Sequence, residues 1–310
     1  MKLLFSFPLL LLCGMAQAQW THSDGLLPVN GTKLYVRITG SHSSKPGHEP
    51  VIVLHGGPGL NQSYIQPHLR RLSKGHPVIF FDQRASGRSS TPRPDSITLG
   101  MTAGDIEGLR QQLHLDKIVL FAHSWGAIPA IVYATRYPQQ VAALIFCNPV
   151  PLNHDFDVEQ QQRLNKLQTA GDSTDRSIVM GSPDFKAGRT EAYRKLMMIG
   201  FRHLFADEKN RRLLTLQLPD NYLTSSKALY EGLSPELRSY NYYEQLRHFT
   251  FPILILYGEK DAIPEAAARK MLEAAPNSRL ALFRHSGHFI FIEEPKRFTN
   301  EVERFIGTLR

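Results

Sequence analysis

A serine flanked by small residues stands where an apolar run gives way to a segment of helical character. The local sequence is Ala122-His123-Ser124-Trp125-Gly126. A serine on a sharp strand-to-helix turn is presented as a nucleophile, and such a turn needs small residues two places to either side because the two backbones come close. Gly126 and Ala122 supply them, with Ala122 where the turn usually has glycine. The segment predicts nucleophilic catalysis by Ser124, with His123 packing behind the turn.

Serine is a weak nucleophile at neutral pH, so Ser124 needs a base, and the base needs an orienting acid. Two downstream loops carry candidates, and each loop follows a short apolar run. Glu259 and Asp261 are the candidates for the acid, and His285 and His288 are the candidates for the base. Because ligand sites in open α/β sheets gather at the carboxyl ends of the strands, we expect both loops to lie on the same edge as Ser124.

A glycine-rich turn, His-Gly-Gly-Pro-Gly, occupies residues 55–59 directly after another apolar run. Glycine lets a backbone N–H group come close to the carbonyl oxygen of a substrate. We expect the N–H groups of Gly57 and Trp125 to form the oxyanion hole. A phosphate-binding loop is the alternative for a glycine-rich turn, but the Lys and Ser/Thr of that motif are missing.

Short apolar runs rich in Val and Ile alternate with helix-like segments along most of the chain. The expected buried strands are residues 51–54, 78–81, 118–122, 141–147, 253–257 and 280–283, with an edge strand at 33–39. The expected helices are residues 65–73, 101–113, 127–137, 262–275 and 295–309. Strands that are buried on both faces and separated by helices indicate an α/β fold with a mostly parallel sheet flanked by helices.

The alternation of strands and helices is interrupted between residues 150 and 250, where apolar residues recur at helical spacing. We expect a helical cap over 150–250, inserted into a core formed by 19–149 and 251–310. Residues 1–18 combine a basic start, an apolar run too short to span a bilayer, and the small-x-small pattern Ala16-Gln17-Ala18. They predict a signal peptide and a secreted or periplasmic protein. An uncleaved N-terminal anchor is the alternative.

Five motifs together resemble the prolyl iminopeptidase family of α/β-hydrolases. They lie at residues 55–59, 82–89, 124–126, 258–261 and 287–295, so that the resemblance covers the chain on both sides of the insertion. The resemblance implies an α/β-hydrolase fold without a cofactor, which releases N-terminal proline from peptides through an acyl-enzyme. It also implies that Asp261 rather than Glu259 is the acid and that His288 rather than His285 is the base.

The motif at residues 82–89, Asp-Gln-Arg-Ala-Ser-Gly-Arg-Ser, has no expected chemical role because the serine, acid and base already fill those roles. We expect a structural role instead. Asp82 together with Arg84 or Arg88 would form a charge-assisted network that fixes this loop beside the oxyanion turn.

Release of N-terminal proline is the first functional hypothesis. The resemblance implies that acidic cap residues hold the ammonium group of the substrate, and an ammonium in a pocket needs carboxylates close by. Glu191, Glu231 and Glu244 are the candidates within the insertion. This hypothesis predicts a carboxylate patch above Ser124.

A carboxylester hydrolase for small or lipid-like acyl esters is the alternative. It predicts an apolar cap pocket lined by residues such as Phe201, Leu204 and Tyr222. A catalytically silent binding module with the same fold is a third reading. The complete set of nucleophile, acid and base argues against that reading.

Composition limits the partners. The formal net charge is +8, but the 36 basic residues are dispersed rather than gathered in a block, so we do not expect a nucleic-acid partner. No group of His, Cys, Asp and Glu has the spacing of metal ligands, so we expect no metal. After loss of Cys13 with the signal peptide, Cys147 is the single cysteine, and its apolar surroundings predict a core residue. We expect a peptide or small-molecule substrate and no membrane span in the mature chain.

Overall fold

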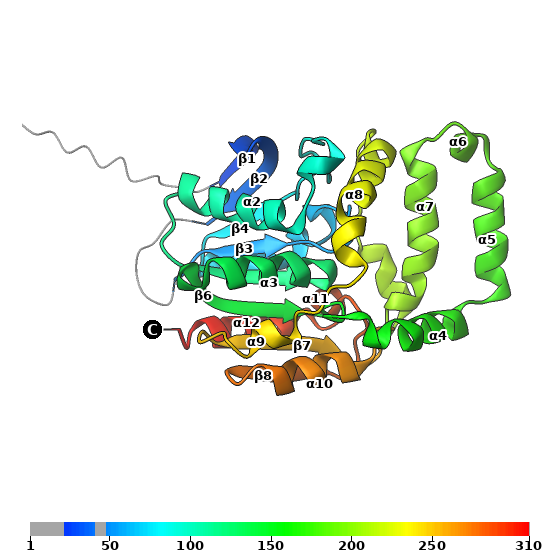
Figure 1. Ribbon diagram of the computed structural model, residues 1–310. Helices are drawn as coiled ribbons and strands as arrows, with labels where there is room; N and C mark the ends of the chain where they lie inside the picture. The colour runs from blue at the N-terminus through cyan, green and yellow to red at the C-terminus, as the bar shows by residue number, and fades with distance from the viewer. Residues whose placement is uncertain (1–21, 41–47, 310) are drawn as a thin grey trace, which may run out of the picture.

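The computed structural model describes residues 22–40 and 48–309, so the predicted signal peptide and Cys13 lie outside the described residues. Eight strands form one sheet in the order β1-β2-β4-β3-β5-β6-β7-β8 (Figure 1). The strands are β1 (His22–Val29), β2 (Thr32–Thr39), β3 (Val51–Leu54), β4 (Val78–Phe81), β5 (Ile118–His123), β6 (Val141–Cys147), β7 (Ile253–Gly258) and β8 (Ser278–Phe283). β2 pairs antiparallel with β1 and β4, and every other pairing is parallel.

The central strands are buried on both faces. In β3, Ile52 and Leu54 pack in one apolar cluster, whereas Val51 and Val53 pack in a second cluster on the opposite face. This division follows from the alternation of side chains along a strand. Both faces therefore need a cover of helices, which explains why these strands are continuous apolar runs.

Helices supply that cover, as Figure 1 shows. One face packs against α2 (Leu99–Gln112), α3 (Ala127–Arg136), α9 (Tyr243–Leu246) and α10 (Glu265–Ala274). The other face packs against α1 (Gln66–Leu69), α11 (Ile290–Glu293) and α12 (Pro295–Ile306). None of the described helices is both long enough and apolar enough to cross a membrane. The α/β architecture predicted from the sequence is confirmed.

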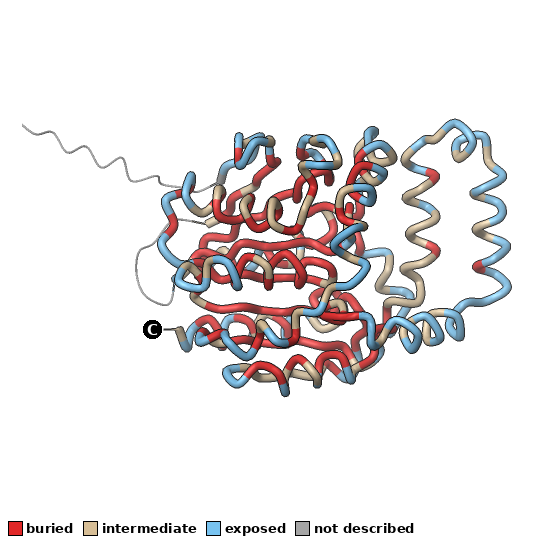
Figure 2. The backbone as a smooth tube through the Cα atoms, viewed as in Figure 1, coloured by how far each residue is buried: buried red, intermediate tan, exposed pale blue. Residues whose placement is uncertain are grey.

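The segment between β6 and β7 is helical and stands beyond the carboxyl ends of the strands (Figure 1). Its helices are α4 (Asp157–Leu167), α5 (Ala170–Gly181), α6 (Pro183–Lys186), α7 (Thr190–Phe201) and α8 (Tyr222–Leu237), which we call the cap. Leu229 and Leu233 anchor α8 in the core, whereas α5 and α6 are mostly exposed (Figure 2). The cap therefore overhangs the edge of the sheet where the candidate residues lie.

Several elements differ from the sequence-based expectation, among them the short helix α11, which was not expected. The helix expected at 65–73 is a short α1 followed by a 3-10 turn. Strand β1 was not expected, because its sequence mixes polar residues with Gly25 and Pro28. It pairs only with β2, and such an edge position tolerates proline. Cys147 is fully buried at the end of β6, as predicted, and burial raises the pKa of its thiol.

Candidate active site

Ser124 occupies the turn between β5 and α3. Its φ angle is +54°, a left-handed backbone conformation that is unusual for a residue with a side chain. The turn is tight, because a Cβ atom on Gly126 would lie 2.6 Å from the carbonyl oxygen of Leu54 on the neighbouring strand. Ala122 is fully buried at the end of β5, where its methyl group is accommodated. The local geometry is that of a serine presented at a strand-to-helix elbow.

His288 and Asp261 are brought together from the loops after β8 and β7. The Nδ1 atom of His288 lies 2.7 Å from Oδ2 of Asp261, and both side chains are buried. Since a carboxylate can only accept, Nδ1–H donates this bond and Nε2 is left as the nitrogen that can take a proton. His288 and Ser124 line the same cavity. The alternative base, His285, is exposed. The alternative acid, Glu259, has its Oε1 atom 3.8 Å from Nε of Arg284.

Asn148 supports Asp261, a role that the sequence analysis missed. Its Nδ2 group donates to Oδ2 of Asp261 at 2.7 Å and to the carbonyl oxygen of Gly287 at 3.2 Å. The backbone N–H of Ile263 donates to the other carboxylate oxygen of Asp261 at 3.1 Å. Asn148 is fully buried with a φ of +46°. A polar residue directly after the apolar run 141–147 was the signal that could have identified it.

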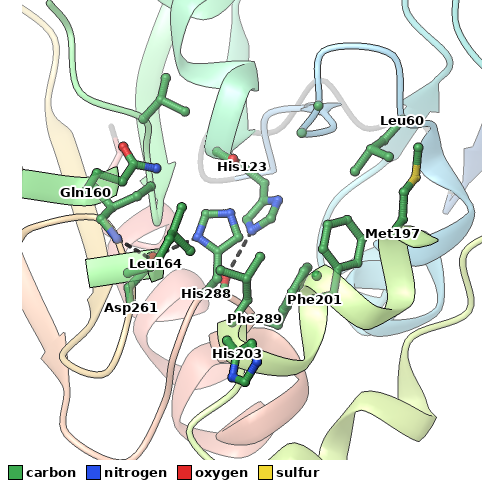
Figure 3. Close-up of a pocket in the computed structure, with 18 of the residues that line it drawn as sticks. Leu60, His123, Gln160, Leu164, Met197, Phe201, His203, Asp261, His288 and Phe289 are labelled. Atoms are coloured by element: carbon green, nitrogen blue, oxygen red, sulfur yellow. Dashed lines mark hydrogen bonds and ion pairs between the residues drawn. The ribbon is translucent and has the colours of Figure 1, made fainter. Parts of the chain in front are cut away.

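A second buried histidine, His123, lies beside His288, and their ring centroids are 4.8 Å apart (Figure 3). His123 Nε2 lies 3.0 Å from the carbonyl oxygen of His288, so it must carry the proton and donate. The other nitrogen, Nδ1, therefore accepts from the hydroxyl group of Tyr64 at 2.7 Å. Burial lowers the pKa of His123 well below its usual value, which keeps the ring neutral.

The glycine-rich turn at 55–59 lies against Ser124. A Cβ atom on Gly56 would be 3.1 Å from Cβ of Ser124, and Gly57 lines the same cavity as Ser124 with a φ of +139°. Among the turn, loop and cap hydrogen bonds of the described residues, none uses the backbone N–H of Gly57 or of Trp125 as a donor. Both groups are therefore available to a substrate oxygen, as an oxyanion hole requires.

The motif at 82–89 is built differently from the expected network. Arg84 pairs with Asp105 of α2, with Nε 2.7 Å from Oδ2, rather than with Asp82. The carboxylate of Asp82 instead accepts the backbone N–H groups of Gln62 at 2.9 Å and Arg88 at 2.8 Å. Asp82 thus orders two turns by accepting backbone hydrogen bonds. The expected pairing with Arg84 was wrong, whereas Arg88, the other expected partner, meets Asp82 through its backbone N–H.

The cavity above Ser124 has a volume of about 510 Å³. Much of its wall is apolar, formed by core and cap residues that include Leu60, Leu164, Met197, Phe201 and Phe289 (Figure 3). Leu204 and Tyr222 also line it. Among the described residues that line the cavity, Asp261 is the single carboxylate, and it is engaged by His288 and Asn148.

The three glutamates expected to bind an ammonium group do not line this cavity. Each is exposed and lies near a basic residue of its own helix or turn. Glu191 is 2.7 Å from Arg194, Glu231 is 3.9 Å from Lys227, and Glu244 is 3.5 Å from Arg247. The structure does not bring them to Ser124. No group of three or more His, Cys, Asp and Glu side chains in the described part of the chain is placed to hold a metal ion.

Comparisons with known proteins agree with this architecture. Residues 49–295 match the family described as alpha/beta hydrolase fold. The proline iminopeptidase of Clostridium botulinum is 28% identical over 293 residues, which cover 92% of this chain and 98% of that protein. That of Lactobacillus delbrueckii subsp. bulgaricus is 29% identical and covers 89% of this chain and 95% of that protein.

Solved structures show the same fold. The proline iminopeptidase of Mycobacterium smegmatis superposes with a TM-score of 0.68 at 20% identity, covering 92% of this chain and 97% of that one. An esterase from Exiguobacterium antarcticum superposes with a TM-score of 0.67 at 24% identity, covering 92% of this chain and all of that one. At this level of identity the likeness concerns the fold and leaves the substrate open.

Proposed function

This chain belongs to the alpha/beta hydrolase fold family, and from that premise we propose that it is a serine hydrolase that cleaves carboxylic esters through an acyl-enzyme. The nucleophile is Ser124, the base is His288 and the orienting acid is Asp261. The observation that carries the choice of substrate is the cavity wall, which is largely apolar and has no carboxylate apart from Asp261 among the described residues.

The mechanism follows from the proton positions. Nε2 of His288 takes the hydroxyl proton as Ser124 attacks the substrate carbonyl, and the Asp261 carboxylate stabilises the imidazolium that forms. The N–H groups of Gly57 and Trp125 bind the oxyanion. His288 then passes its proton to the leaving alcohol, which departs and leaves the acyl-enzyme. Water deprotonated by His288 attacks that ester, and the acid is released as Ser124 regains its proton.

The cavity wall favours an uncharged acyl group next to the reacting carbonyl. Phe201, Leu204 and Phe289 would contact such a group, and burial of apolar surface would supply its binding energy. An ammonium group placed there would lose its hydration without gaining a carboxylate partner, which is unfavourable. These contacts support the ester hydrolase over the aminopeptidase that the sequence motifs favoured.

Release of N-terminal proline is the second candidate, and one observation favours it. Curated relatives called proline iminopeptidases align over about nine tenths of this chain at 25–29% identity. The chemistry at Ser124 would be the same, with an amine in place of the alcohol as leaving group. The imino group of the substrate would then have to be held without a cap carboxylate.

Hydrolysis of 4-nitrophenyl butyrate and of proline 4-nitroanilide by the purified chain separates the two candidates. We expect the ester to be turned over and the anilide to react far more slowly. Ser124→Ala should lower ester turnover by several orders of magnitude, because only the oxyanion hole and binding remain. Preferred turnover of the anilide would reverse the ranking, and unchanged activity of Ser124→Ala would remove Ser124 from the mechanism.

We further propose that the enzyme acts outside the cytoplasm, as a secreted or periplasmic protein processed after Ala18. The leader-like composition of residues 1–18 supports this proposal. Mass spectrometry of the protein recovered from the producing cells should find a mature chain that begins at Gln19. A full-length chain confined to the cytoplasm would contradict it.

A further inference from the structure

The cap side of the cavity wall is basic. Arg176 of α5 is the single lysine or arginine among the described residues that line the cavity. Its Nη1 group donates to the side-chain oxygen of Gln168 at 2.9 Å, and Gln168 also lines the cavity. No carboxylate of the described residues forms an ion pair with Arg176. Among the described residues, its guanidinium is therefore free of a direct ion pair.

Arg202, on the 3-10 turn Arg202–Leu204, differs from Arg176 in its pairing. It is paired with Asp172 at 2.6 Å, with Asp175 at 3.0 Å and with Glu208 at 3.1 Å. Three carboxylates neutralise that guanidinium, and it does not line the cavity. The arginine that does line the cavity is thus the one whose charge is left for a ligand.

His203 also lines the cavity, and a residue of α5 holds it in place. Asp172 and Arg176 are four residues apart on α5 and so share one face of the helix. Nε2 of His203 lies 2.7 Å from Oδ2 of Asp172, whose side chain is fully buried. Asp172 also accepts the backbone N–H of Thr169 at 2.7 Å, and these bonds hold the pKa of its carboxyl below its usual value. An ionised, immobile Asp172 therefore fixes the His203 ring.

Because Nε2–H of His203 donates to Asp172, the remaining ring nitrogen, Nδ1, is an acceptor, and it has no hydrogen-bond partner in the part of the chain that the structure describes. His203 lines the cavity together with Phe201, and Figure 3 shows both among the residues that surround it. The cap thus presents a guanidinium held by Gln168 and an imidazole held by Asp172 to the same cavity into which Ser124 opens.

We propose that Arg176 forms a carboxylate-binding subsite in the cap wall, so that the preferred substrate carries a carboxylate at the end remote from the carbonyl that Ser124 attacks. This inference rests on the proposed serine hydrolase function. A guanidinium binds a carboxylate through paired N–H groups, which gives both affinity and orientation. The apolar wall then holds the intervening chain, and the substrate class is an ester whose acyl or leaving group ends in a carboxylate.

Half-esters of dicarboxylic acids test whether the carboxylate belongs to the acyl group of the substrate. The 4-nitrophenyl half-esters of succinate, glutarate and adipate vary the spacing between carbonyl and carboxylate, and 4-nitrophenyl butyrate is the neutral reference. The leaving-group side is tested with the butyrate ester of 4-hydroxybenzoate against that of its methyl ester. We expect one charged series to exceed its neutral counterpart in kcat/KM.

Arg176→Gln should lower kcat/KM for the favoured charged substrate by about tenfold to a hundredfold, mainly through KM, as expected for loss of a charge-assisted hydrogen bond. The neutral ester should change by less than about twofold, since no partner of its own is lost. Arg176→Lys should retain part of the preference. Arg163→Gln is the matched control, because Arg163 is a cap arginine that pairs with Glu159 and does not line the cavity.

A wild-type enzyme that treats charged and neutral esters alike, or an Arg176→Gln variant that loses both equally, would overturn the subsite while the hydrolase function stands. Absence of Ser124-dependent ester turnover would instead overturn the proposed function. In that case, a binding measurement tests the subsite independently of catalysis. Calorimetry with Ser124→Ala should show monobenzyl glutarate binding more tightly than benzyl butyrate, and Arg176→Gln in that background should abolish the difference. The butyrate ester of 4-hydroxybenzoate against that of its methyl ester tests the leaving-group side in the same way, and no difference in either pair would refute the subsite.

Discussion

The hydroxyl group of Tyr64 lies 2.7 Å from Nδ1 of His123, and both side chains are buried behind the candidate nucleophile. The same hydroxyl accepts the backbone N–H of Gly56 at 2.6 Å, and Nε2–H of His123 donates to the carbonyl oxygen of His288 at 3.0 Å. Burial raises the pKa of Tyr64, so its proton stays in place. This chain of hydrogen bonds joins the oxyanion turn to the loop of the proposed base.

Tyr64→Phe breaks that chain at its centre. It leaves Nδ1 of His123 and the N–H of Gly56 buried without partners, which we expect to lower the free energy of unfolding by about 1–3 kcal/mol. The oxyanion turn and His288 also lose a shared support, and we expect kcat to fall between about tenfold and a hundredfold with little change in KM. Denaturant unfolding and steady-state kinetics measure the two effects.

Tyr133→Phe is the matched control for Tyr64→Phe. Tyr133 is also fully buried, and its hydroxyl group donates to Glu107 at 3.0 Å, away from the cavity. Its loss should reduce stability by a similar amount and leave kcat unchanged. Equal kinetic losses in both variants would mean that Tyr64 acts only through general stability.

Asp261→Asn tests the orienting acid. The amide keeps the shape of the carboxylate but can no longer stabilise an imidazolium, and it disturbs the tautomer of His288. We expect kcat to fall by about 10⁴-fold, the size found when such an acid is replaced by its amide. Glu259→Gln is the control, since Glu259 is 3.8 Å from Arg284 and does not line the cavity. A strong loss in Glu259→Gln with a mild one in Asp261→Asn would exchange their roles.

Asp105→Asn tests the buried ion pair that holds the 82–89 loop. Arg84 and Asp105 are nearly inaccessible to solvent, so removing one charge leaves the other buried without compensation. We expect a loss of about 3–5 kcal/mol in unfolding free energy. Asp95→Asn breaks an exposed pair with Arg93 and should change stability by less than about 1 kcal/mol. Equal effects in thermal or denaturant unfolding would show that the burial of the pair has no energetic consequence.

The positions of Ser124, Asp261 and His288 at one edge of the sheet could be predicted because each follows an apolar run that becomes a parallel strand. Parallel strands align their carboxyl ends, so residues far apart in sequence meet there. The strand bounds at 51–54, 78–81 and 141–147 were predicted to the residue, since burial on both faces leaves an uninterrupted apolar run.

The partners of charged groups could not be predicted in the same way. Arg84 is two residues from Asp82 in sequence, yet it pairs with Asp105 on α2. Asp82 is held by backbone N–H groups of a turn in which a Cβ atom on Gly87 would lie 2.3 Å from its carboxylate. Such choices depend on backbone geometry that composition and spacing do not contain.

In the cap, too, the sequence did not reveal where the charged side chains would point. Glu191 lies on a helix whose apolar spacing does not determine which side faces the cavity, and the structure directs it to Arg194 on the exposed side. Phe201, Leu204 and Tyr222, which were predicted to line an apolar cap pocket, do line the cavity, but the polar cap residues Arg176 and His203 gave no signal of their own. Thr169 and Asp172 form a capping box in the pattern Thr-x-x-Asp, which could be recognised in the sequence.

His55 makes stability depend on pH. Its Nδ1–H donates to the carbonyl oxygen of Gly56 at 2.8 Å, and its Nε2 accepts the backbone N–H of Gln83 at 3.1 Å. A second proton on the ring would face that N–H, and burial lowers the pKa of His55 to about 4. The folded protein therefore binds fewer protons here than the unfolded chain, whose histidine has its usual pKa of about 6.5.

Because of this difference, the free energy of unfolding increases as the pH rises from 4 to 6.5. Stability rises with pH wherever the unfolded state binds more protons, so the contribution of neutral His55 is present above about pH 6.5 and is lost as the pH falls toward 4. The loss amounts to roughly 3 kcal/mol over that interval. His123, whose pKa is also lowered by burial, acts in the same direction. The buried carboxyls of Asp82 and Asp105 have raised pKa values and oppose this trend in acid.

His55→Asn isolates the contribution of one ring. The variant is less stable at pH 7, because it loses part of the bonding to Gln83, but it has no proton to take up. Its unfolding free energy, measured by denaturant titration from pH 7 to 5, should therefore fall less steeply than that of the wild type, by up to about 1.4 kcal/mol per pH unit. His285→Asn, at an exposed position, should keep the wild-type slope. Parallel curves for the wild type and His55→Asn would mean that folding does not shift the pKa of His55.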